Sequence, residues 1–128
     1  MKLIQLISYW QRVRDNLLVT IEKFNEDDLA YVPFEGCWPV AELLLHIAHE
    51  EYGEINYGIT AELDEWPAGY SIEDYPTIES IKALLKEVHD LTEAYLMTID
   101  DADLEKYIEA PWGATFRQGD MLMHVLEH

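Results

Sequence analysis

Two histidines, His124 and His128, stand four residues apart near the end of this 128-residue chain, in a run that otherwise has the pattern of an amphipathic helix. Residues four apart project from the same face of an α-helix about one turn from each other, so the two imidazoles can share one divalent metal ion. A third ligand must then come from another element. The best candidate is His46, which interrupts the apolar stretch from Leu43 to Ala48. The sequence therefore predicts a three-histidine metal site between two packed helices.

Other polar residues lie close to these histidines in the sequence. Glu50 follows His46 by one helical turn and can accept a hydrogen bond from a metal-binding histidine and so orient it. The alternative, a solvated member of the Glu50-Glu51 pair, remains open, as does a hydrogen-bonded core role for His46. We expect His49 to be an exposed or rim residue, and His89 to be solvated at the edge of a polar helix face.

The periodicity of apolar residues predicts the elements that must position the site. Apolar side chains recur at steps of three and four in three long stretches, about residues 2–24, 39–63 and 77–99, and a shorter helix begins near residue 119. Thr77 and Asp120 are the expected N-caps of the last two helices. Residues 64–76, which contain prolines and a glycine, form a long connection that can serve as a crossover or as the rim of a site.

These elements predict an all-α fold, a four-helix bundle with a long connection between helices 2 and 3 and a fourth helix that is cut short. Only about nine residues of the fourth helix are present, so we expect the natural chain to continue beyond His128; a purification tag beginning at Leu126 is the alternative. We expect Trp38 to plug the core at the start of the second helix. Gly53 and Gly58 weaken that helix, which close helix contact or room for a ligand would explain.

Composition limits the classes of function. The length and the 49% apolar content predict a single domain over residues 1–128. A net charge of −18 disfavours nucleic acid and anionic membranes as partners. The single cysteine, Cys37, cannot form an intramolecular disulfide, which predicts a cytoplasmic protein. The N-terminal stretch has helical spacing and no small-residue cleavage site, so we interpret it as structure and not as a signal peptide.

Four parts of the chain, taken in order, resemble the DinB/YfiT-like family. They are the N-terminal helix, the segment from Leu29 to Pro33, the run from Gly36 to Ala48 with its tryptophan and histidine, and the ending from Leu122 to His128. The resemblance implies a four-helix bundle that holds a divalent metal ion with three histidines, one on helix 2 and two on helix 4. Nickel, zinc, iron and manganese are all chemically admissible to such an imidazole-rich site.

The resemblance assigns His46 to the helix-2 position and leaves two alternatives on helix 4. In the first alternative, His128 matches the histidine that opens the family's usual ending. The next ligand then lies four residues beyond the chain, His124 is a neighbour of the site, and the metal is absent or incompletely coordinated. If the ligands are instead His124 and His128, the site is complete.

The resemblance also implies a class of chemistry. Relatives include metal-dependent transferases and isomerases that use low-molecular-weight thiols, so the enzyme hypothesis is a metal-dependent thiol transferase or hydrolase with a small-molecule substrate, in which the metal ionises the thiol. The alternative is a non-catalytic bundle, dimeric through its helix faces, whose metal site is structural or vestigial. We expect a homodimer under either reading; the reaction and the substrate stay open.

Overall fold

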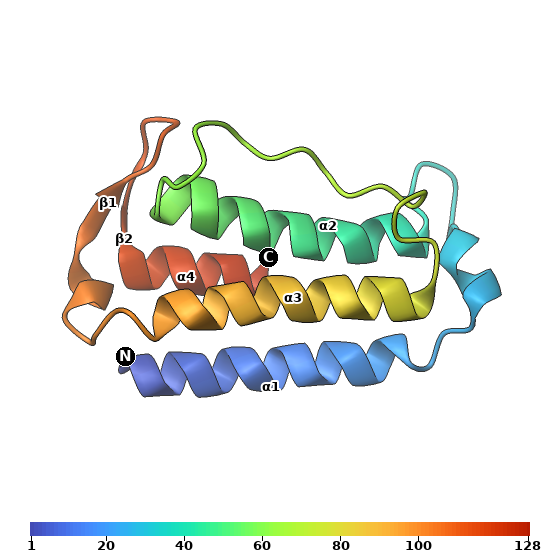
Figure 1. Cartoon of the computed structure of the whole chain (residues 1–128), viewed down its shortest axis with the longest axis horizontal. Helices are drawn as coiled ribbons and strands as arrows, with labels where there is room; N and C mark the ends of the chain where they lie inside the picture. Colours follow the sequence, from blue (N-terminus) through green and yellow to red (C-terminus); the bar gives the residue numbers. More distant parts are fainter.

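The computed structural model describes residues 1–128 and consists mainly of four α-helices (Figure 1). They are α1 (Leu3–Ile21), α2 (Val40–Gly53), α3 (Ile78–Leu96) and α4 (Gln118–Glu127). Helix α3 packs against α1 and α2, and α4 packs against α1 and α2. The all-α bundle expected from the sequence is confirmed. None of these helices is both long and apolar enough to cross a membrane.

Shorter elements join the helices. A 3₁₀ helix, η1 (Glu26–Ala30), follows α1; a π-helical segment, η2 (Glu54–Ile59), continues α2; and η3 (Asp103–Glu105) precedes a small antiparallel hairpin. The hairpin pairs β1 (Tyr107–Glu109) with β2 (Thr115–Arg117) and leads directly into α4. The connection between η2 and α3 runs along the outer side of α2 (Figure 1).

The helix ends differ in how well the sequence predicted them. Thr77 is the N-cap of α3, where its side chain accepts a hydrogen bond from the Ser80 amide, as expected. The prediction that Asp120 caps α4 is wrong, because α4 begins at Gln118 and the Asp120 carboxylate instead pairs with Arg117 at 3.1 Å. The first and third helices also end earlier than predicted, at Ile21 and Leu96.

The core has two apolar clusters separated by a polar layer. One cluster joins the second half of α1 to the first halves of α2 and α3, and the other joins the first half of α1 to η2 and α4. Between them, Arg14, Glu51 and Thr92 are buried at the level where the clusters meet. The layer interrupts three otherwise apolar helix faces, so its polar atoms must find partners within the protein.

Two aromatic rings pack directly on the backbone of the second helix. A Cβ added at Gly53 would lie 2.6 Å from the Trp66 ring, and one at Gly58 would lie 2.9 Å from the Trp112 ring. Close contact therefore accounts for both glycines, but it is made by tryptophan rings from outside the helices and not by the packed helix that the sequence had led us to expect. The expectation that Trp38 plugs the core is wrong, because its side chain is 52% exposed.

Candidate functional site

The predicted histidines meet between α2 and α4. The ring centroids of His46 and His128 are 5.7 Å apart, and those of His124 and His128 are 5.6 Å apart. Burial of Leu122, Val125 and Leu126 sets the orientation of α4 and brings the His128 ring against His46 of α2, while His124 and His128 both stay exposed to solvent. This proximity is what the three-histidine hypothesis requires, and ligation of a metal by His46, His124 and His128 stays a prediction.

Glu50 lies between two of the imidazoles. Its Oε1 atom is 3.8 Å from Nδ1 of His46, and its Oε2 atom is 3.8 Å from Nε2 of His128. The side chains of Glu50 and His46 are 21% and 28% exposed, so the carboxylate faces the rings without being fully removed from solvent. Glu50 is therefore placed to bind a cation itself or to orient both rings.

His49 belongs to the same cluster. One ligand atom from each of His46, His49 and Glu50 can be chosen so that all three lie within 4.8 Å of one another, which makes this group able to hold a metal ion. The Nε2 atom of His49 lies 2.8 Å from the Pro67 carbonyl oxygen. Because a carbonyl only accepts, Nε2 carries the proton and Nδ1 keeps its lone pair. His49 is partly buried and lies on the rim of a cavity, which is one of the two positions expected for it, exposed or at a rim.

That cavity, of about 360 Å³, opens beside the cluster. His46 and His49 form one side of it, and Tyr70 and Ile72 from the long connection form another. The Trp38 ring stands edge-on to His46 with the centroids 4.8 Å apart. Burial, with added repulsion from neighbouring groups that include Tyr52 and Tyr75, raises the pKa of Tyr70 to about 12, so its phenol stays protonated at neutral pH.

Glu54 extends the cluster by one more turn, and the sequence analysis missed it. Burial, followed by the charge of Glu50, raises the pKa of the Glu54 carboxyl, whereas His124 and His128 act in the opposite direction. Its Oε2 atom is buried and has no hydrogen-bond partner. The four-residue spacing of His46, Glu50 and Glu54 was the available signal, because it places all three on one face of a continuing helix.

The expectation that His89 is solvated is wrong. Its side chain is 12% exposed, and it contacts Glu51 in the polar layer, away from the histidine cluster. Cys37 is partly buried and forms no disulfide.

Comparison with known proteins adds one finding. The sequence model of the DinB superfamily matches residues 9–128, which is most of the chain and includes α2, α3, α4 and α1 from residue 9 onward. No curated protein matches the chain.

Proposed function

Because the chain belongs to the DinB superfamily, we propose that it binds a divalent metal ion between α2 and α4 and uses it in a thiol-dependent transfer reaction. The observation that carries the proposal is the position of Glu50, whose two carboxylate oxygens each face an imidazole nitrogen, one from His46 and one from His128. The three groups come from α2 and from the C-terminal end of α4.

The donor set suits such an ion. Two ligand atoms that each lie about 2.1 Å from one ion are roughly 3.0 to 3.4 Å apart. The 3.8 Å separations between Glu50 and the two histidines are close to this range, so small side-chain rotations bring the atoms into place. Imidazole and carboxylate donors suit nickel, zinc, iron and manganese.

His46 and His128 are the proposed ligands, and His124 is the proposed third imidazole because it stands one turn from His128 on the same face. Glu50 is proposed to orient His46 and His128 or to bind directly. The group of His46, His49 and Glu50 offers a second arrangement that shares two of these residues. His46 and His49 line the cavity that Trp38 rims, whereas His46, Glu50 and His128 line a separate cavity of about 180 Å³, so His46 is the residue common to both.

When bound, the divalent ion supplies a Lewis acid that lowers the pKa of a bound thiol or water. The protein's own residues then bind and orient the second substrate. The cavity of about 360 Å³ is in the range of small-molecule sites, and the aromatic rings of Trp38 and Tyr70 provide flat apolar walls for it. This supports a low-molecular-weight thiol and a small electrophile as the reacting pair, with hydrolysis as the outcome if water replaces the thiol.

The metal is tested on protein purified without a histidine tag. We expect metal analysis to find about one divalent ion per chain and His46→Ala to lose it, because His46 is common to both ligand arrangements. His89→Gln, which removes a histidine outside the cluster, should keep its metal. Stoichiometric metal that survives His46→Ala would place the ion elsewhere and overturn the site.

The reaction is tested separately, by following transfer of a small thiol to an electrophilic substrate before and after treatment with a chelator. We expect turnover that is lost with the metal and restored by adding it back. Turnover that survives chelation would exclude the metal mechanism, and metal binding without any turnover would favour a non-catalytic bundle.

A further inference from the structure

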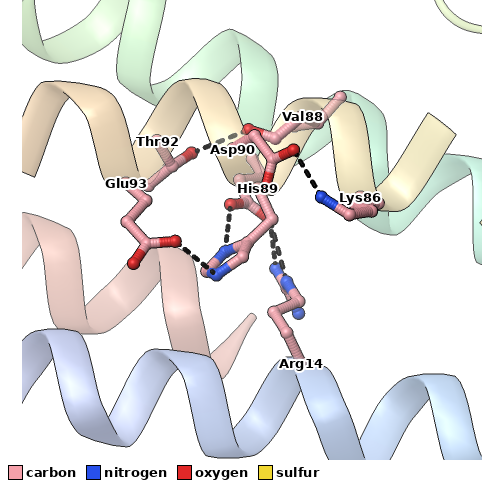
Figure 2. A network of polar contacts seen from close by, with 8 residues as sticks. Arg14, Lys86, Val88, His89, Asp90, Thr92 and Glu93 are labelled. Atoms are coloured by element: carbon pink, nitrogen blue, oxygen red, sulfur yellow. Dashed lines mark hydrogen bonds and ion pairs between the residues drawn. The ribbon is translucent and has the colours of Figure 1, made fainter. Parts of the chain in front are cut away.

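A second cavity, of about 290 Å³, lies between α1 and α3 beside the polar layer. Its lining includes Arg14 and Asp15 from α1 and Lys86, His89 and Glu93 from α3. It has no histidine in common with the cluster described above. Figure 2 shows Arg14 reaching from α1 toward α3, where His89 and Glu93 face each other.

The positive charges of this cavity are already paired. The Nη2 and Nε atoms of Arg14 donate to Oε2 of Glu51 at 2.6 and 2.9 Å. The Lys86 ammonium donates to Asp90 at 2.7 Å. The carboxylates that remain, Asp15 and Glu93, have no salt bridge to Lys or Arg, so the uncompensated charge of the cavity wall is negative. The cavity therefore favours a cation.

His89 adds an acceptor to that wall. Its Nδ1 atom lies 3.6 Å from Oε1 of Glu51, and its Nε2 atom lies 3.8 Å from Oε2 of Glu93. Both ring nitrogens and Oε1 of Glu51 are buried and without hydrogen-bond partners. In the tautomer on which the proposal below depends, the proton of the ring lies on Nδ1, facing Glu51, and the Nε2 lone pair stands beside the Glu93 carboxylate. Two acceptors side by side need a donor, and a positively charged donor satisfies both.

The remaining wall is hydrocarbon, contributed by Leu17, Leu18 and Leu85. A bare metal ion would leave this apolar surface and most of the volume unfilled, and an anion would meet Asp15 and Glu93. From these three features we propose that the cavity between α1 and α3 binds a primary alkylamine. The ammonium group pairs with the Glu93 carboxylate beside the His89 ring, and the alkyl chain lies on the three leucines.

The test is a titration of the full chain with n-pentylammonium chloride at constant ionic strength, followed by amide chemical shifts. For six non-hydrogen atoms we expect a dissociation constant on the order of 1 to 10 mM. The shifts should be confined to residues near 11–18 and 85–93. Glu93→Gln should weaken binding about tenfold or more, and its side chain is 40% exposed in the native protein, so the variant should fold.

The matched control is Glu87→Gln, which removes the same charge from an exposed position of α3 outside the cavity and should leave the affinity unchanged. Equal weakening by both variants would mean diffuse attraction to an acidic protein and would overturn the proposal. So would equal binding of n-pentanol, tighter binding of magnesium with the same shifts, or no saturation at all.

Discussion

The Oε2 atom of Glu50 on α2 lies 3.8 Å from the Nε2 atom of His128 on α4. The other oxygen of the same carboxylate lies 3.8 Å from Nδ1 of His46, one turn earlier on α2. A single side chain therefore links the imidazoles of two helices. Ionised, it is an acceptor for protonated nitrogens and a ligand for a cation, so the charge of Glu50 should control what the cluster binds.

The first prediction concerns that charge. Glu50→Gln keeps the shape of the side chain and removes its negative charge, so we expect the affinity for a divalent ion to fall about 10- to 100-fold. Competition with a chromogenic chelator measures this affinity. Glu79→Gln, which changes an 84% exposed side chain on α3, is the matched control and should have no effect. Equal affinities of the Glu50→Gln variant and the native protein would show that the carboxylate takes no part in the site.

The second prediction separates the two ligand arrangements. His128→Gln should lower the metal affinity at least about tenfold, whereas His49→Gln should change it less than about threefold. The reason is that Nε2 of His49 is already engaged by the Pro67 carbonyl, so this side chain also has a structural role in holding the long connection. The opposite order of the two variants would assign the metal to His46, His49 and Glu50 alone.

The repeating apolar pattern was sufficient to predict the helices, because burial of one helix face depends on spacing alone. It predicted the three long helices, the Thr77 cap and the inward side of α4. Packing of these helices against one another was then enough to predict that His46 lies opposite His128. It did not predict the hairpin before α4 or the π-helical continuation of α2, which depend on contacts between residues distant in sequence, such as Trp112 on Gly58.

Buried charge was the feature that spacing could not reveal. A solvated Glu50-Glu51 pair was one of the alternatives that spacing left open, yet Glu51 is 1% exposed because Arg14 reaches it from another helix. The prediction that His89 is solvated was wrong because its partner, Glu51, lies on a different helix, α2, and spacing along α3 cannot reveal that contact. The opposite error was made for Trp38, which was predicted to be buried and is exposed. A large aromatic side chain at the start of a helix can rim a cavity as readily as it fills a core.

The third prediction concerns Gly53. Alanine is the better helix former by about 1 kcal/mol, but its Cβ would lie 2.6 Å from the Trp66 ring. We expect overpacking to dominate, so that Gly53→Ala destabilises the protein by about 1 to 3 kcal/mol in urea unfolding and shifts the tryptophan emission. Gly69→Ala is the control, because its Cβ would meet His49 at an ordinary 3.7 Å. If Gly53→Ala in a Trp66→Ala background is still destabilising, the clash with the ring is not the cause.

The fourth prediction concerns the ion pair in the polar layer. Glu51→Gln leaves the guanidinium of Arg14 buried without a counter-charge, so we expect a loss of about 3 to 5 kcal/mol in the free energy of unfolding at neutral pH. Replacing both residues, as Arg14→Met with Glu51→Leu, removes the charges together and should recover most of that loss. A double variant as unstable as Glu51→Gln would mean that packing, and not charge, is what the pair provides.

The fifth prediction is the pH dependence of the same pair. Burial raises the pKa of Glu51, but His89, Arg14 and Thr92 together outweigh burial, so the pKa lies below its ordinary value of 4.5. A carboxyl whose pKa is lower in the folded than in the unfolded state stabilises the fold fully above the unfolded value, and this contribution disappears as the pH falls through the folded value. The difference in unfolding free energy between the native protein and Glu51→Gln should therefore be constant from about pH 7 to 5 and shrink below about pH 4.5. Urea unfolding of both proteins at each pH measures it, with Glu79→Gln as a reference whose difference from the native protein stays small throughout. A difference that grew on acidification would mean that Glu51 folds protonated.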